Sequence, residues 1–221
     1  MAVADRTRVK ICGLTRHEDA RRADELGADF LGVVLSAGFG RSVRAHEAAA
    51  VVEGVGASTV AVLVNETPSM AAYLATLIGA SVIQLHGEEE VSVVEELRSL
   101  GAWKLWKAVR ARSLRDLARA IARYGPVVDG FLVEGWKQGA MGGAGASLSL
   151  EPEAVRASIP DGLDFILAGG LTPESVAGEV ARFRPEVVDV SSGVERSLGT
   201  KNEELVSSFI ESARMTPDSD S

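Results

Sequence analysis

Eight short runs rich in β-branched residues alternate with eight longer segments of helical periodicity along the chain. This alternation predicts parallel strands, because each helical segment must return the chain across the sheet before the next strand begins. The threonines before Pro68 and Pro173 predict the capped starts of two of these helices. The expected strands are residues 9–12, 30–35, 59–64, 82–85, 103–109, 127–134, 164–167 and 187–190, and the expected helices are residues 16–26, 44–54, 68–79, 89–99, 114–123, 151–157, 173–182 and 203–213.

Two architectures accommodate eight such units, a closed (β/α)8 TIM barrel and an open doubly wound sheet. Eight regular units in 221 residues favour the barrel. The turn that follows the first strand also lacks the glycine fingerprint of a dinucleotide-binding fold. We therefore expect a single-domain α/β barrel over residues 1–214 and a flexible, polar and acidic tail over 215–221. The glycine- and alanine-rich stretch 135–149 is either a mobile lid or slack chain.

Composition excludes several classes of function. The net charge is −8 and the basic residues are scattered, which argues against a nucleic-acid surface. No apolar run is long enough for a bilayer and no signal peptide opens the chain. The single cysteine, Cys12, has no partner for an internal disulfide, so we expect a cytoplasmic protein. The histidines and the cysteine lack metal-ligand spacing, and 142–145 is not a Walker loop, so no metal and no cofactor are expected.

The first expected strand carries a candidate general base. Residues two apart share a face of a strand, and apolar Val9 and Ile11 suit the helix-facing side, so Lys10 and Cys12 are expected to point into the barrel. A buried lysine beside a thiol favours the thiolate and lowers the pKa of the thiol. The alternative is that Cys12 is a small, inert core residue.

Polar residues at other strand ends are further candidates, because active sites of such barrels lie at the carboxyl ends of the strands. Glu134 ends an apolar strand, where burial would raise its pKa and suit it to general-acid catalysis; the alternative is a solvated carboxylate. Gln84 and His86 share a face and serve either ligand contact or support. Arg41 is either a contact for an anionic group or an ordinary surface arginine. Asp129 has the opposite parity to Glu134 and is expected to be structural.

Two loops have the composition of a phosphate cradle. Small residues follow the seventh strand at Gly169 and Gly170, and follow the eighth strand at 191–193. In barrels of this kind the seventh and eighth loops commonly bind phosphate through backbone N–H groups. One glycine pair alone indicates only a tight turn, but the two loops together indicate a phosphorylated substrate. The expected phosphate-binding residues are Gly169, Gly170, Ser191, Ser192 and Gly193.

Four motifs together resemble the successive signatures of the phosphoribosylanthranilate isomerase (TrpF) family: Val-Lys-Ile-Cys-Gly-Leu at 9–14, Gln-Leu-His-Gly at 84–87, Leu-Ala-Gly-Gly-Leu at 167–171 and Asp-Val-Ser-Ser-Gly-Val-Glu at 189–195. The resemblance implies a cofactor-free Amadori rearrangement of N-(5-phosphoribosyl)anthranilate in tryptophan biosynthesis, by a monomer or a homodimer. It implies that Cys12 removes the C2′ proton and that Glu134 protonates the furanose oxygen. The expected substrate-binding residues are Lys10, Arg41, Gln84, His86 and Asp189.

The chain also departs from the family pattern. The family's aspartate at the end of strand six corresponds to Glu134, whose longer side chain moves the carboxyl by about an ångström, a displacement that can cost about a hundredfold in rate. The following loop, 142–150, lacks the family's lysine, aspartate and tryptophan, and 198–202 also differs. Three hypotheses follow: a working isomerase, a divergent relative acting on another phosphorylated aminosugar, and a non-catalytic barrel that binds a phosphorylated ligand.

Overall fold

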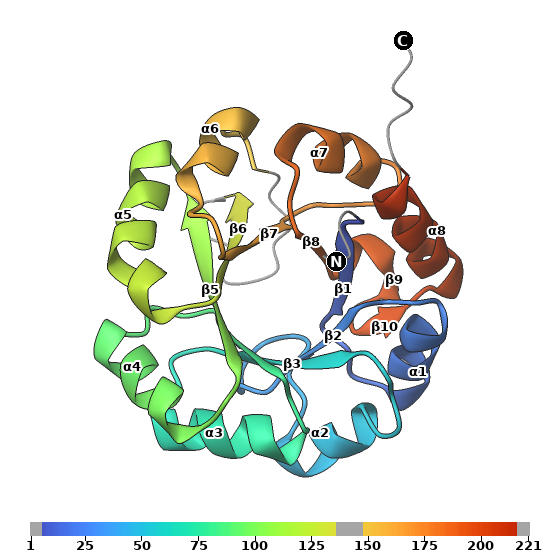
Figure 1. Ribbon diagram of the computed structural model, residues 1–221. Helices are drawn as coiled ribbons and strands as arrows, with labels where there is room; N and C mark the ends of the chain where they lie inside the picture. Colours follow the sequence, from blue (N-terminus) through green and yellow to red (C-terminus); the bar gives the residue numbers. More distant parts are fainter. Residues whose placement is uncertain (1–5, 136–147, 216–221) are drawn as a thin grey trace, which may run out of the picture.

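The protein forms a closed barrel of eight parallel strands surrounded by eight helices (Figure 1), in a computed structural model that describes residues 6–135 and 148–215. β1 pairs with both β2 and β8, which closes the ring and excludes the open doubly wound sheet. The barrel strands are β1 Arg8–Cys12, β2 Phe30–Val34, β3 Ser58–Leu63, β4 Val82–Leu85, β5 Lys104–Ala111, β6 Gly130–Gly135, β7 Asp164–Ala168 and β8 Val187–Val190. The helices are α1 His17–Glu25, α2 Ala45–Val51, α3 Pro68–Leu77, α4 Val91–Leu100, α5 Leu114–Tyr124, α6 Pro152–Ser158, α7 Val176–Phe183 and α8 Glu203–Arg214.

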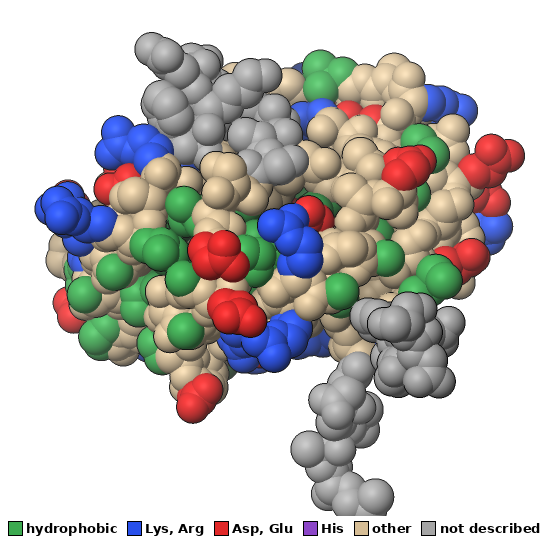
Figure 2. Space-filling view, turned by 90° about the horizontal axis from the view of Figure 1, so that it is seen from above, with side chains coloured by type: hydrophobic (Ala, Val, Ile, Leu, Met, Phe, Trp, Pro, Cys, Tyr) green, Lys and Arg blue, Asp and Glu red, His purple; other side chains and the backbone are tan. Residues whose placement is uncertain are grey.

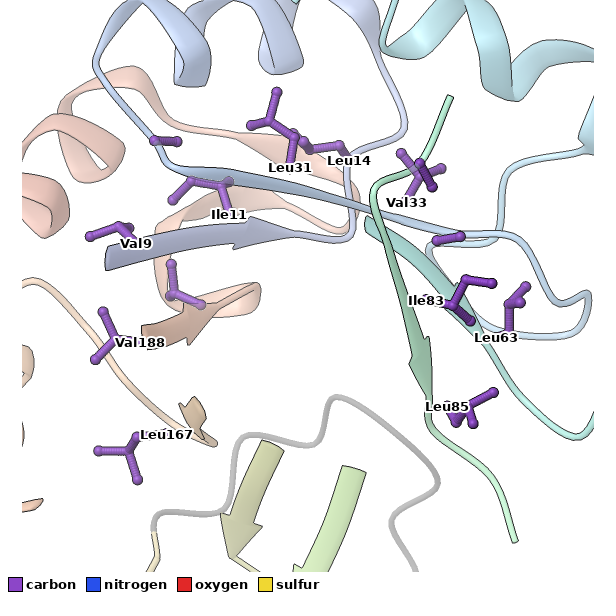
Figure 3. Close-up of a cluster of buried hydrophobic side chains, with 14 of the residues drawn as sticks. Val9, Ile11, Leu14, Leu31, Val33, Leu63, Ile83, Leu85, Leu167 and Val188 are labelled. Carbon is purple, nitrogen blue, oxygen red and sulfur yellow. The ribbon is translucent and has the colours of Figure 1, made fainter. Parts of the chain in front are cut away.

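Each strand divides its side chains between two cores. Val9 and Ile11 belong to the apolar layer between strands and helices, where Figure 3 shows them with outward-facing side chains of neighbouring strands. Cys12 instead packs inside the barrel with residues such as Trp106 and Leu132. The predicted parity of the first strand is therefore confirmed. It follows from the alternation of side chains along an extended chain combined with an apolar helical layer outside.

The helix starts were predicted correctly at one threonine and wrongly at the other. The hydroxyl of Thr67 accepts a hydrogen bond from the amide of Met70 at the start of α3, as expected of a cap. Thr172 does not cap α7, which begins at Val176. The amide of Thr172 instead donates to the hydroxyl of Ser175, 3.0 Å away, so that a turn precedes the helix.

Two boundaries differ from the sequence prediction in ways that affect the site. The chain forms a short 3-10 helix, η1 Gly125–Val127, and β6 begins only at Gly130. Asp129 lies just before β6, where its carboxylate accepts hydrogen bonds from the amide of Leu105 and the side chain of Arg98, so its structural role is confirmed. β5 continues to Ala111, beyond its expected end at residue 109, and so includes Arg110.

The segment after β8 contains structure that the sequence analysis did not predict. A 3-10 turn, η2 Ser192–Val194, leads into an antiparallel pair formed by β9 Glu195–Ser197 and β10 Thr200–Lys201. These strands are three and two residues long and carry charged side chains, so no apolar alternation marks them. The pair places Glu195 and Lys201 beside the end of the barrel.

The predicted lid and tail fall largely outside the described ranges, since 136–147 and 216–221 are not among them. In the part of the chain that is described, no helix has the length and apolar character needed to cross a membrane. On the face seen in Figure 2, acidic and basic side chains are interspersed and not separated into patches of one sign.

Candidate active site

One cavity of about 470 Å³ opens at the carboxyl ends of the barrel strands. It brings together most of the candidates that the sequence analysis selected from separate strands and loops. Cavity-lining candidates are Cys12, Arg41, Gln84, His86, Glu134, Gly169, Gly170, Asp189, Ser191, Ser192 and Gly193. Lys10 is the exception: it is fully buried and does not line the cavity, so the structure does not support its expected contact with substrate.

Lys10 forms a buried ion pair beneath the cavity. It is the register partner of Asp189 across β1 and β8, and its Nζ lies 2.7 Å from Asp189 Oδ1. Burial alone would lower the pKa of Lys10, but Asp189 and Cys12 raise it overall. Lys10 is therefore held as an ammonium group by a carboxylate that itself faces the cavity.

The electrostatic prediction for Cys12 was wrong in sign. Burial raises the pKa of the Cys12 thiol and the charge of Asp189 raises it further, which outweighs the opposite effect of Lys10. The first motif contains the lysine but not its carboxylate partner, which comes from the other end of the chain. Cys12 is thus a thiol, with an ammonium group beside it that can stabilise a thiolate once one forms.

Gly32 leaves room for the Cys12 thiol and the Lys10 ammonium group. It lies opposite Cys12 in the register of β1 and β2. A Cβ atom at Gly32 would lie 2.9 Å from Cys12 Sγ and 3.1 Å from Lys10 Nζ, closer than packed atoms tolerate. The glycine therefore allows the lysine and the thiol to occupy the same layer of the barrel interior.

Glu134 is held by two donors at the opposite side of the site. Arg110, its register partner on β5, places Nε 2.9 Å from Glu134 Oε1, and Nε2 of His86 lies 3.3 Å from the same oxygen. Burial raises the pKa of Glu134, but hydrogen bonds and charge from His86 and Arg110 lower it overall. The prediction that the pKa of Glu134 is raised was therefore wrong. The residues before Glu134 in β6 are apolar, but the neighbouring strand β5 places the cation of Arg110 beside it.

Arg110 was missed because the expected fifth strand stopped one residue before it. The signal was present in the alternation of Trp106, Ala108 and Arg110, which continues the inward parity of β5 to the cavity. Extending that strand by one residue would have placed a cation beside the end of the sixth strand.

His86 combines the two roles that the sequence analysis left open. It lines the cavity and also supports Glu134, while its Nδ1 lies 2.9 Å from the Gln84 amide nitrogen. The carbonyl oxygen of the Gln84 side chain is buried and has no hydrogen-bond partner among the described residues. Gln84 also lines the cavity, although its side chain is almost fully buried.

Arg41 is part of a built network and not an ordinary surface residue, since only 16% of its side chain is exposed. Its Nε and Nη2 donate to the two carboxylate oxygens of Glu195 at 2.8 and 2.7 Å. Lys201 donates to the same carboxylate at 2.9 Å and to the carbonyl of Ser191 at 3.0 Å. Neither Glu195 nor Lys201 was selected from the sequence, because the short hairpin that carries them was not predicted.

The two predicted phosphate loops border the same cavity and touch each other. Gly169 and Gly170 have φ angles of +94° and +66°, a conformation that favours glycine. A Cβ at Gly193 would lie 2.0 Å from the carbonyl oxygen of Leu171, so this close approach of the loops also requires glycine. Backbone groups can therefore come close to a bound anion here.

Among residues 6–135 and 148–215, no three histidine, cysteine or carboxylate side chains gather into a group that could hold a metal ion. The groups that the site does assemble are a thiol, a carboxylate with a neighbouring imidazole, an arginine and two glycine-containing loops. Such a set can move protons on a phosphorylated sugar with one group as base and another as acid.

Comparison with known proteins points to one family. The family model described as N-(5'phosphoribosyl)anthranilate (PRA) isomerase matches residues 9–212. The N-(5'-phosphoribosyl)anthranilate isomerase of Rubrobacter xylanophilus is 36% identical over 210 residues, covering 94% of this chain and 98% of the relative. The crystal structure of phosphoribosyl anthranilate isomerase from Thermotoga maritima has a TM-score of 0.83 at 33% identity, with coverage of 94% and 98%. A structure of phosphoribosyl anthranilate isomerase in complex with reduced 1-(o-carboxyphenylamino)-1-deoxyribulose 5-phosphate has a TM-score of 0.80 at 31% identity, with the same coverage.

Proposed function

The chain belongs to the N-(5'-phosphoribosyl)anthranilate isomerase family, and from that premise we propose that Cys12 and Glu134 carry its reaction. The enzyme is the isomerase of tryptophan biosynthesis that converts N-(5-phosphoribosyl)anthranilate to 1-(2-carboxyphenylamino)-1-deoxyribulose 5-phosphate. One observation carries the assignment of roles: a thiol, a carboxylate and two glycine-containing loops line a single cavity.

The phosphate and the ring carboxylate of the substrate are bound by different groups of the protein. The phosphate lies against the loops at 169–170 and 191–193, whose glycines let backbone amides approach it. Arg41 contacts the carboxylate of the aromatic ring from the cavity wall. The ribose then lies between Cys12 and Glu134, beside the Gln84 side chain that also lines the cavity.

Ring opening needs a proton on the furanose oxygen. As the bond from C1′ to this oxygen breaks, the lone pair of the anthranilate nitrogen forms a C1′=N bond, and the oxygen takes the proton. The lowered pKa of Glu134 makes it a carboxylate at rest, so in this proposal it takes up a proton from solvent and delivers that proton to the furanose oxygen. Nε2 of His86, 3.3 Å from the same carboxylate, and Arg110 keep Glu134 in position.

Isomerisation then needs a base at C2′. Cys12 loses its proton to solvent once the positively charged Schiff base lies beside it, because that charge and Lys10 both favour the thiolate. The sulfur takes the C2′ proton, the electrons of that bond form the C1′=C2′ bond of an enaminol, and the electrons of the C1′=N bond return to the nitrogen. A proton from solvent is then added at C1′, and the enol hydroxyl loses its proton to solvent, which gives the ketone product. Acid and base are provided by side chains of this chain alone.

The test is turnover of N-(5-phosphoribosyl)anthranilate by the purified protein, together with growth of a tryptophan auxotroph that lacks this isomerase. Turnover and rescue are expected. A folded protein that binds the reduced product analogue without turnover would instead be a non-catalytic barrel. A folded protein that neither binds the reduced product analogue nor turns over this substrate would instead act on another aminosugar phosphate.

A cytoplasmic location is part of the proposal, because a phosphorylated metabolite stays in the compartment in which it is made. Cell fractionation tests it. The isomerase of Thermotoga maritima is described as dimeric, so a homodimer and a monomer are the two states to distinguish. Analytical ultracentrifugation at micromolar concentration decides between these two states.

A further inference from the structure

Glu195 is a buried carboxylate that the acid–base chemistry does not use. Only 5% of its side chain is exposed, and it accepts two hydrogen bonds from Arg41 and one from Lys201. Burying a carboxylate is unfavourable unless cations and donors surround it. The pKa of Glu195 is raised by burial, but the hydrogen bonds and charges of Arg41 and Lys201 lower it overall, so the group is ionised.

The ion pair with Glu195 uses only one edge of the Arg41 guanidinium. Nε and one N–H of Nη2 face Glu195, which leaves Nη1 and the second N–H of Nη2 at the other edge. That remaining edge has the geometry for a second bidentate contact with a carboxylate. Arg41 lines the cavity, so a ligand can reach it.

The backbone also constrains this arginine. A Cβ at Gly13 would lie 2.4 Å from Arg41 Cδ and 2.8 Å from Ser191 Oγ, so the arginine stem lies directly over a glycine at the end of β1. Anchored there and at Glu195, the guanidinium has little freedom to turn. A group held in this way loses little conformational entropy when it binds ligand.

Lys201 ties the pair to the phosphate loop. Its ammonium donates to Glu195 and to the backbone carbonyl of Ser191, a residue of the expected phosphate cradle. Its own amide donates to Asp19 at 3.0 Å, which anchors β10 to α1. Two cations surround one carboxylate, so the three groups retain a single positive charge that favours an anion in the cavity beside them.

We propose that Glu195, braced by Lys201, is a positioning residue that aims the open edge of Arg41 at the ring carboxylate of the substrate. By this device the enzyme prefers a carboxylated arylamine over an uncharged one. The inference rests on the proposed function and extends it to the source of aromatic-ring selectivity.

The test compares two ligands with and without Glu195. The ligands are the reduced product analogue and its counterpart without the ring carboxylate, with Kd measured by calorimetry. Wild type is expected to bind the carboxylated ligand about 10–100-fold more tightly, as a charge-assisted pair allows. In Glu195→Gln that preference is expected to shrink to about threefold or less, while affinity for the ligand without the carboxylate stays nearly constant.

Companion variants separate positioning from general damage to the loop. Glu195→Asp keeps the charge and is expected to restore part of the preference. Lys201→Met removes the brace and is expected to give an intermediate loss, and it provides the same test if Glu195→Gln fails to fold. Glu203→Gln is the matched control, since Glu203 lies two residues beyond Lys201, is exposed and pairs with Arg22 outside the cavity.

Three results would overturn the inference: no preference in wild type, full preference in a folded Glu195→Gln, or equal loss of both ligands in Glu195→Gln. Turnover by wild type is scored separately. A wild type that prefers the carboxylated ligand but does not isomerise the substrate would refute the catalytic proposal while leaving this one intact.

Discussion

Arg110 and Glu134 are direct register partners on adjacent strands, and Arg110 Nε lies 2.9 Å from Glu134 Oε1. This contact and that with His86 lower the pKa of Glu134, so the proposed acid rests as a carboxylate. It must therefore take up its catalytic proton before it acts, while His86, bound to the same oxygen, helps to hold it in place. The site is a carboxylate steadied by an imidazole and an arginine, and not an isolated buried acid.

Replacement of Arg110 tests this arrangement, because it is expected to change the pH dependence of kcat/KM. Burial raises the pKa of Glu134, whereas His86 and Arg110 lower it, so loss of the Arg110 cation raises it. In Arg110→Met we expect the basic limb of the kcat/KM profile to move to higher pH, because Glu134 then keeps its proton to higher pH. The exposed Arg112, which pairs with Asp116, gives the control Arg112→Met with an unchanged profile. A basic limb that stays in place would remove Arg110 from this role.

The general base is tested by Cys12→Ser. A hydroxyl is a far weaker acid than a thiol, so we expect kcat to fall by about 10²–10⁴-fold, the range over which general-base catalysis contributes. Affinity for the reduced product analogue should change by about threefold or less, because Cys12 contributes little to the phosphate or carboxylate contacts. Steady-state kinetics and calorimetry measure the two effects. Retention of most activity would assign the base to another group.

The acid is tested by Glu134→Gln, which keeps size and removes the transferable proton. We expect about a hundredfold loss in kcat with little change in KM, and retention of substantial activity in Glu134→Asp, which keeps the carboxyl. Glu88 is another carboxylate that lines the cavity, and it is exposed, so Glu88→Gln is the matched control with near-normal kcat. A silent Glu134→Gln would mean that the acid lies elsewhere.

Replacement of Gly32 by alanine is expected to displace Cys12, the proposed base, by steric overlap. An alanine Cβ there would meet Cys12 Sγ at 2.9 Å and Lys10 Nζ at 3.1 Å. Overpacking of this kind typically costs about 1–3 kcal/mol of stability, and displacement of the thiol should lower kcat as well. Urea denaturation and kinetics measure both. Gly178 in α7 has open space around its Cβ position, so Gly178→Ala should instead stabilise by about 0.5–1 kcal/mol.

A second buried ion pair predicts how stability depends on pH. Lys107 Nζ lies 3.0 Å from Glu89 Oε2, and both side chains are almost fully buried. Burial raises the pKa of Glu89, but Lys107 and backbone amides lower it below its ordinary value near 4.5. A lowered carboxyl pKa contributes stability above the unfolded pKa, and this stability is lost as pH falls toward the folded one.

The corresponding variant is Lys107→Met, which leaves Glu89 buried without its cation. We expect a loss of about 3–5 kcal/mol near pH 7 in guanidinium denaturation, and a smaller loss near pH 4. The double variant Lys107→Met with Glu89→Gln should recover part of the stability, because it leaves no unpaired charge. Equal stability of the single and double variants would contradict the buried-pair account.

Sequence patterns predicted positions well and charge states poorly. Inward parity correctly placed Cys12, Gln84 and His86 at the barrel mouth, because alternation along a strand is a local property of extended backbone. The pKa directions of Cys12 and Glu134 were wrong, because each depends on a partner from another strand. A charge state is set by all groups within a few ångströms, and these were not visible from one motif.

The amino-acid sequence by itself determined the eight-unit alternation, the face on which each polar strand residue lies and the two glycine-containing loops after β7 and β8. Only the tertiary structure decided which of these residues meet. Lys10 and Asp189 are 179 residues apart and become neighbours because the first and last strands pair to close the ring. Arg41 and Glu195 likewise meet through an unpredicted hairpin. Local periodicity is encoded residue by residue, whereas ionisation and orientation depend on distances that exist only once the barrel has closed.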